Sequence, residues 1–196
     1  MEFRDIVLKR RMVRNFADQP VDPAIIARIL ELTRHAPSAG FTQGQAFIIV
    51  TKPETKKAIA ATCQEEEYTQ RGFAAFISKA PALLVPCTSE TAYHRRYQEA
   101  DKVNADGSEI DWPVPYWFMD IGCAVMIALL AAIDEGLVSA FVGSKDLGAL
   151  RTLLNIPAEV TPVGVIALGY RAQDIPSPSL KRGRKPDEEY IHRERW

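Results

Sequence analysis

The sequence lacks most of the patterns by which cysteine, nucleotide or hydrolase chemistry is recognised. Its three cysteines, Cys63, Cys87 and Cys123, are widely spaced and form neither a zinc-binding nor a paired redox motif, so we expect reduced, buried thiols. No G-x-G-x-x-G stretch follows a strand-like run, which argues against a dinucleotide-binding Rossmann unit, and there is no P-loop. The G-x-S-x-G elbow of serine hydrolases is also missing.

Neither the histidines nor the charge balance indicates a metal, a nucleic acid or a membrane. His35, His94 and His192 are scattered without metal-ligand spacing, so we interpret each as a surface or loop residue. The 24 Lys and Arg residues are balanced by 25 Asp and Glu residues, which leaves no broad basic surface for nucleic acid. The N-terminal residues lack the apolar stretch of a signal peptide, and the longest apolar segment, 121–133, is too short to span a bilayer. We expect a cytoplasmic protein.

A length of 196 residues, with 47% hydrophobic and 25% charged residues, is typical of one globular domain. The helix-like stretches cover 23–36, 54–61 with an interrupted continuation towards 79, 117–135 and 145–154. The strand-like runs cover 46–50, 82–85, 139–143 and 163–170. This alternation of helices and strands predicts an α/β or α+β fold.

The stretch 117–135 is apolar on nearly every side of the helix that it predicts. Small residues such as Gly122, Ala124 and Ala128 would permit close approach of another backbone. We expect either the central helix of the domain or part of a dimer interface.

The segment 88–116 has no clean periodicity and is too long for an ordinary connection. It contains or adjoins several aromatic residues, which disfavours disorder. We predict a lid over a binding site; the alternative is that its aromatic side chains merely pack the loop on the core. After 170 the chain is a polar tail whose terminal Tyr190, Ile191 and Trp196 are expected to dock on a partner subunit.

Arginines gather near both ends of the chain. Arg10, Arg11 and Arg14 lie within five residues, and Arg182 and Arg184 form a second cluster. The guanidinium group suits phosphate and carboxylate oxygens, and in a helix Arg10 and Arg14 would share a face. One cluster alone is more simply a solvated helix end. Two clusters in a chain of net charge −1 indicate a local anion site.

The loop 36–45 is small and polar, with two glycines, and it leads into a buried strand. Such a loop exposes backbone amides and could hold a polar ring, although it could also be a plain connection.

Taken in order, these segments resemble the FMN-dependent nitroreductase family. The matching stretches are 10–16, 36–40 with Gln43, the alanine-rich helix that ends at 135–137, the strand that runs to Gly143, 168–170 and 184–189. No single motif decides the match, but their order and spacing are fairly specific and cover nearly the whole chain.

The resemblance implies an α+β fold, a three-layer α-β-α sandwich formed by one domain over 1–196. It also implies an intertwined homodimer, with a dimer-exchange tail at 171–196 and FMN bound at the interface. The residues that correspond to the family's FMN contacts are Arg10, Arg11, Met12, Pro37, Ser38, Ala39, Gln43, Val142, Gly143, Arg182 and Arg184. Many relatives have Ser where Met12 stands, so only the Met12 main chain would serve.

Substrate contacts are expected from the first loop and the aromatic segment. The candidates are Phe41, Arg96, Tyr97, Trp112 and Tyr116, with Arg96 able to steer an anionic ligand. No catalytic acid or base and no metal ligand is assigned, because the flavin carries the hydride chemistry.

The implied activity is ping-pong electron transfer. NAD(P)H would reduce the flavin, leave, and be replaced by an electron-poor small molecule such as a nitroaromatic, quinone or enone. Two alternatives remain open: a flavin-binding storage or sensor protein without turnover, and a specialised relative of the reductive dehalogenases.

Overall fold

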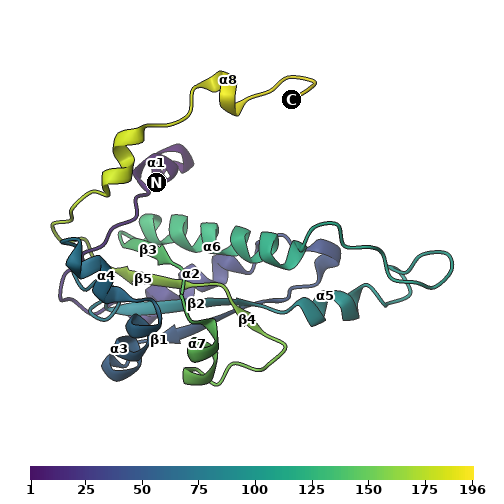
Figure 1. Cartoon of the computed structure of the whole chain (residues 1–196), viewed down its shortest axis with the longest axis horizontal. Helices are drawn as coiled ribbons and strands as arrows, with labels where there is room; N and C mark the ends of the chain where they lie inside the picture. The colour runs from purple at the N-terminus through teal and green to yellow at the C-terminus, as the bar shows by residue number, and fades with distance from the viewer.

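A five-stranded antiparallel sheet separates two layers of helices in the computed structural model, which describes residues 1–196 (Figure 1). The strands follow the order β1-β2-β5-β3, and β4 pairs with β2 beside β5. Their bounds are β1 (Gln45–Val50), β2 (Ala82–Thr88), β3 (Val138–Val142), β4 (Thr161–Pro162) and β5 (Val165–Gly169). The α-β-α sandwich expected from the resemblance is therefore confirmed.

The α-helices are α1 (Phe3–Lys9), α2 (Pro23–Thr33), α3 (Pro53–Thr62), α4 (Glu65–Gln70), α5 (Glu90–Arg96), α6 (Tyr116–Asp134), α7 (Leu147–Leu153) and α8 (Asp187–Tyr190). Two short 3₁₀ turns, η1 (Ala39–Phe41) and η2 (Pro178–Arg182), complete the list. Helices α2 and α6 cover one face of the sheet, and α3 and α7 cover the other (Figure 1).

The alternation of side chains along β2 divides the interior into two cores. Leu83 and Val85 pack in the core with α3 and α7, whereas Ala82 and Leu84 pack in the core with α2 and α6. A strand that is buried on both faces needs apolar residues at every position. This explains why β2 and β5 appear in the sequence as continuous apolar runs without polar alternation.

Helix α6 is the central helix of its layer. It is 19 residues long and apolar enough to cross a membrane by length and composition. The apolar run 121–133 taken from the sequence therefore underestimated the length of the apolar helix. However, 56% of its most apolar window is buried within the domain, which is the behaviour of a core helix. Asp120 is the only charged side chain before Asp134, and it too is buried. A cytoplasmic location stays a prediction.

The N-terminal arginines do not share a helix face, so that part of the sequence interpretation is wrong. Helix α1 ends at Lys9, and Met12 forms a parallel bridge with Ser139 at the edge of the sheet. The Val13 amide donates to the Ser139 carbonyl at 3.0 Å. Pairing with β3 satisfies this backbone better than a continued helix, and it leaves Arg10 and Arg14 in extended chain.

Other boundaries also differ from the sequence prediction. The helical pattern after 61 ends with α4 at Gln70, well short of 79. Strand β2 continues through Pro86, whose missing N–H is tolerated because the β5 ladder ends at Leu84 and the β4 ladder begins at Cys87. Helix α5 was missed within 88–116, although Ser89 caps it by accepting from the Ala92 amide.

A substitution at Gly169, the last residue of β5, tests the packing of this strand, which contributes to both cores. A Cβ placed there would lie 2.6 Å from Pro81 Cδ, and a proline ring cannot move aside freely. We expect Gly169→Ala to cost about 1–3 kcal/mol through overpacking and to lower Tm by several degrees.

The matched control is Gly148→Ala in α7, where the nearest atom to a new Cβ is Asp146 Oδ1 at 3.4 Å. Replacement of this helical glycine by alanine should raise the free energy of unfolding by up to about 1 kcal/mol. Thermal unfolding of the two variants and the parent protein measures the difference; equal Tm values for Gly169→Ala and the parent would contradict the packing at Pro81.

Candidate functional site

A cavity of about 760 Å³ lies between the N-terminal segment and the chain that follows β5. Arg10, Arg11, Met12 and Arg14 line one side, and residues from the stretch 171–180 line the other. Arg171 adds a further guanidinium to these walls, and Asp174 is the only carboxylate among the lining residues. The excess of positive charge makes this cavity suitable for an anionic group.

Arg14 is the side chain best prepared to bind such an anion. Its guanidinium lies over the rings of Phe73 and Phe76, at 5.1 and 5.9 Å from their centroids. Its backbone amide donates to Asp174 Oδ1 at 3.1 Å, but its buried Nε has no hydrogen-bond partner. A desolvated donor without a partner is costly, so this group is ready to accept an anionic ligand.

Sequence reasoning placed Arg14 in the basic cluster but did not select it as a contact. Arg14 is distinguished from the other arginines by its contact with Phe73 and Phe76. Nothing in the sequence places these two phenylalanines against residue 14.

The other expected arginines have different environments. Arg10 and Arg11 both line the cavity, but Arg11 Nη1 also donates to the carbonyls of Leu8 and Arg10 at 2.6 and 2.9 Å and so caps α1. Arg182 and Arg184 are exposed on the tail and do not line the cavity. The structure therefore brings Arg10 and Arg14 together and leaves the C-terminal pair outside.

An apolar groove of about 420 Å³ lies next to the cavity, and Met12 lines both. Its other lining residues come from one side of α6, from β3 and from the turn before β5, and they are Phe118, Ile121, Gly122, Val125, Met126, Leu129, Phe141 and Val163. The Met12 thioether accepts from the Phe141 amide at 3.3 Å, which fixes the side chain at this junction. A hydroxyl at position 12 would lose this apolar contact.

We refer to the cavity and the groove, which share Met12 in their linings, as the track; its cavity part is rich in arginine and its groove part is apolar. Two residues at the end of β3 were expected at the cofactor. Val142, its last residue, is buried in the core with α3 and α7, and Gly143, which follows β3, is exposed with open space where a Cβ would lie.

The loop 37–43 does not line this track within the same chain. Gln43 instead lines a separate cleft of about 360 Å³ with Arg34 and Gln45, between α2 and β1. Ala39 donates its amide to Asp120 Oδ2 at 2.8 Å, and the Gln43 amide donates to Ser38 Oγ at 2.9 Å. The loop is thus ordered by its own contacts, and a ligand in the track would meet it only from another copy of the chain or after a rearrangement.

The aromatic residues of 88–116 pack mainly on one another. Trp112 lies at the centre, with the Tyr97 ring 4.5 Å away and those of Trp117 and Tyr116 at 5.8 and 6.1 Å. The Trp112 indole N–H donates to Glu109 Oε1 at 2.6 Å. This arrangement favours packing of the segment on the core, and a lid function stays a prediction.

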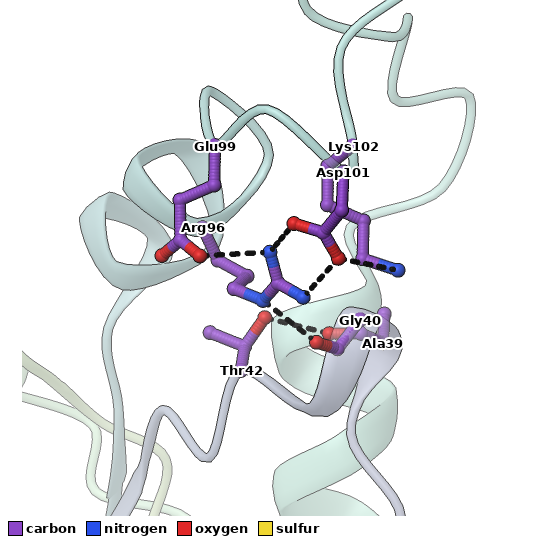
Figure 2. A network of polar contacts seen from close by, with 7 residues as sticks. All are labelled: Ala39, Gly40, Thr42, Arg96, Glu99, Asp101 and Lys102. Carbon is purple, nitrogen blue, oxygen red and sulfur yellow. Dashed lines mark hydrogen bonds and ion pairs between the residues drawn. The ribbon is translucent and has the colours of Figure 1, made fainter.

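Arg96 is fully engaged within the chain (Figure 2). Its Nη atoms bond to both carboxylate oxygens of Asp101 at 2.7 Å, and Nη1 also reaches Glu99 at 2.9 Å. The guanidinium in turn holds the pKa of Asp101 at about 2. Its Nε donates to the Gly40 carbonyl at 2.9 Å. With these donors occupied, the geometry favours a structural contact to the loop over steering of an anion.

Comparison with known proteins places this chain in a family. The model of the nitroreductase family matches residues 7–170. A candidate NADH dehydrogenase/NAD(P)H nitroreductase from Archaeoglobus fulgidus is 29% identical, with 97% of each chain covered. An iodotyrosine deiodinase from Nematostella vectensis is 30% identical over 97% of this chain and 74% of its own length.

Among solved structures, an NADPH:FMN oxidoreductase from Vibrio harveyi, in complex with NAD+, has the same fold. Its TM-score is 0.76 at 21% identity, with 99% of this chain and 77% of that chain covered. The protein therefore belongs to the nitroreductase family, whose members are oxidoreductases.

His94 provides a pH test of the aromatic segment. Its Nδ1 lies 2.6 Å from Glu109 Oε1 and its Nε2 lies 3.6 Å from Glu90, and the hydrogen bond with Glu109 raises the pKa of His94. The charged pair therefore stabilises the fold below the unfolded pKa of about 6.5, and this contribution is lost as pH rises through the higher folded pKa.

We expect His94→Gln to lower Tm most at about pH 6, with the difference from the parent shrinking towards pH 9. Thermal unfolding across this range measures it, with the exposed His35→Gln as control. A constant difference at all pH values would show that the charge on His94 does not stabilise the segment.

Proposed function

We propose that the protein is an FMN-dependent oxidoreductase that uses NAD(P)H to reduce an electron-poor acceptor, such as a nitroaromatic, quinone or enone. The observation that carries this proposal is the track through Met12, which joins an arginine-lined cavity to an apolar groove. A phosphate at one end and a flat ring system at the other match these two environments. The unpartnered Nε of Arg14 also fits a phosphate ligand.

In this proposal Arg10 and Arg14 bind the phosphate, and the fork of Arg14 is held in place by the rings beneath it. Met12 marks the boundary between the polar and apolar parts of the ligand. The groove along α6 excludes water from one face of the ring. Bound FMN supplies the hydride and electron chemistry, while the chain orients it and limits access.

The remaining expected contacts belong to this proposal as well. They are Arg11, Pro37, Ser38, Ala39, Gln43, Val142, Gly143, Arg182 and Arg184 for the cofactor, and Phe41, Tyr97, Trp112 and Tyr116 for the acceptor.

Removal of the Arg14 side chain tests the cofactor site. A charge-assisted bond contributes about 1.5–3 kcal/mol, so Arg14→Ala should weaken FMN binding at least about tenfold. Titration of flavin-free protein, followed by quenching of FMN fluorescence, measures the affinity. Arg95→Ala on α5 is the control, because Arg95 is exposed and does not line the cavity. Equal FMN affinity in both variants would place the phosphate elsewhere.

We further propose that the protein works as a homodimer in which each cofactor is touched by both chains. Phe118, Met119 and Met126 expose apolar surface along one side of α6, a patch of the kind that marks an interface. The tail leaves the layers, passes α1 and ends away from the domain, with Trp196 fully exposed (Figure 1). A second copy would cover both features, and its loop 37–43 would reach the track.

Met126→Glu should therefore dissociate the dimer and weaken FMN binding together, because it places a charge in the apolar patch. Leu147→Glu on α7 is the control, since this exposed leucine lies on the opposite face of the sheet. Sedimentation velocity gives the oligomeric state of each variant. A Met126→Glu variant that remains dimeric with unchanged FMN affinity would contradict the shared site.

Turnover is tested by anaerobic addition of NADPH to the FMN-loaded protein. Rapid loss of the flavin absorbance, reversed by an added quinone or nitroaromatic, is expected for the oxidoreductase. A storage or sensor protein would keep its yellow colour over the same time.

A second candidate function is reductive dehalogenation of an aromatic substrate. The similarity to the Nematostella iodotyrosine deiodinase over nearly the whole chain favours it. Release of iodide from iodotyrosine by the reduced protein would support this activity, and the absence of iodide would leave the acceptors named above.

A further inference from the structure

The backbone of Ala39 and Gly40 is held from two sides by residues distant in sequence. Asp120 of α6 accepts from the Ala39 amide at 2.8 Å. Arg96 of α5 donates to the Gly40 carbonyl at 2.9 Å, as Figure 2 shows. Both contacts are made to backbone atoms, so they constrain the conformation of the loop whatever side chains it carries.

The loop needs such a constraint, because its backbone is in an unfavourable conformation. Gly40, Phe41 and Gln43 have φ values of 61°, 55° and 53°, in the left-handed region that residues with a side chain rarely adopt. The Phe41 ring is 75% exposed, so burial of this ring does not offset the strain. Strained backbone persists only where the surroundings impose it, and such places are often ligand sites.

Both clamping side chains are themselves fixed. Asp120 is buried and accepts a second hydrogen bond from the Tyr93 hydroxyl at 2.8 Å. Arg96 is oriented by both oxygens of Asp101. The Tyr97 ring closes the remaining space, since a Cβ added at Gly40 would lie 2.7 Å from it. The clamp is therefore preorganised in the absence of any ligand.

We propose that Arg96 and Asp120 are positioning residues, which clamp the Ala39 amide and the Gly40 carbonyl and thereby hold the loop 38–43 in the conformation that contacts the flavin. Segment 88–116 then acts as a brace for the cofactor loop, and Arg96 makes no contact with the substrate. This inference rests on the proposed function, because it assumes that the loop meets bound FMN.

The first test measures the loop itself in flavin-free protein. Hydrogen exchange of the Phe41 and Thr42 amides, which donate to the carbonyls of Ser38 and Ala39, reports the closed loop. Arg96→Ala should speed their exchange by about tenfold or more, which corresponds to about 1.4 kcal/mol. Arg95→Ala, an Arg→Ala change at the adjacent, exposed position of the same helix, should leave these rates unchanged.

The second test measures the consequence for the cofactor. Arg96→Ala should weaken FMN binding several-fold and change the absorption band shape of the bound flavin. It should also raise KM for the acceptor more than it lowers kcat, while Tm stays within a few degrees. Arg96→Lys keeps the charge beside Asp101 but lacks the second, fixed donor for Gly40, so it should behave like Arg96→Ala and remain folded.

Three results would overturn the inference. Unchanged loop exchange in Arg96→Ala and Arg96→Lys would show that the clamp does not hold the loop. A general loss of stability that accounts for every change would reduce Arg96 to a structural residue. Faster exchange with normal FMN affinity, while Arg14→Ala still loses FMN, would separate the loop from the cofactor and leave the proposed function intact. If Arg14→Ala keeps its FMN affinity, the proposed phosphate site itself fails.

Discussion

The packing of α6 against one face of the sheet is the constraint on which the other features depend. Its buried side chains, with those of α2, form one of the two cores. Its exposed side supplies the apolar wall of the groove, and its Asp120 receives the loop that carries η1. Near its C-terminal end, Asp134 pairs with the N-terminal amine. One helix thus places the groove, the loop and the first residues of the chain in fixed relation.

The two ends of the ligand track are built by different physical means. At the charged end, Arg14 lies over aromatic rings, which provide an electrostatic attraction while they exclude water and hydrogen-bond partners. At the apolar end, Met12 and Phe141 belong to a backbone contact between the N-terminal segment and β3. Residues 10–16 are extended rather than helical, so this short segment contributes side chains to both the cavity and the groove.

The aromatic segment illustrates how composition and structure can suggest different roles. Its aromatic content indicated a lid, but Trp112 makes its contacts with the neighbouring rings and with Glu109. Arg96, selected as a surface charge that could steer an anion, donates to a backbone carbonyl of the loop. In both cases the residue type suits contact with a ligand, but the partner of its side chain lies within the chain.

The sequence by itself determined the buried strands and the long apolar helix, because continuous apolar runs and helical periodicity reflect burial directly. The alternation of elements left α/β and α+β folds open, and the three-layer sandwich followed from the resemblance to a known family. The sequence also predicted an anion site from the two separate arginine clusters, and this stays a prediction. Only the tertiary structure decided that Arg14 lies on Phe73 and Phe76, that Met12 lines both cavity and groove, and that Asp120 and Arg96 hold neighbouring backbone atoms of one loop. These contacts join residues from about 50 to 130 positions apart. No local pattern encodes such pairs, because each depends on how β-strand pairing and helix packing bring distant segments together.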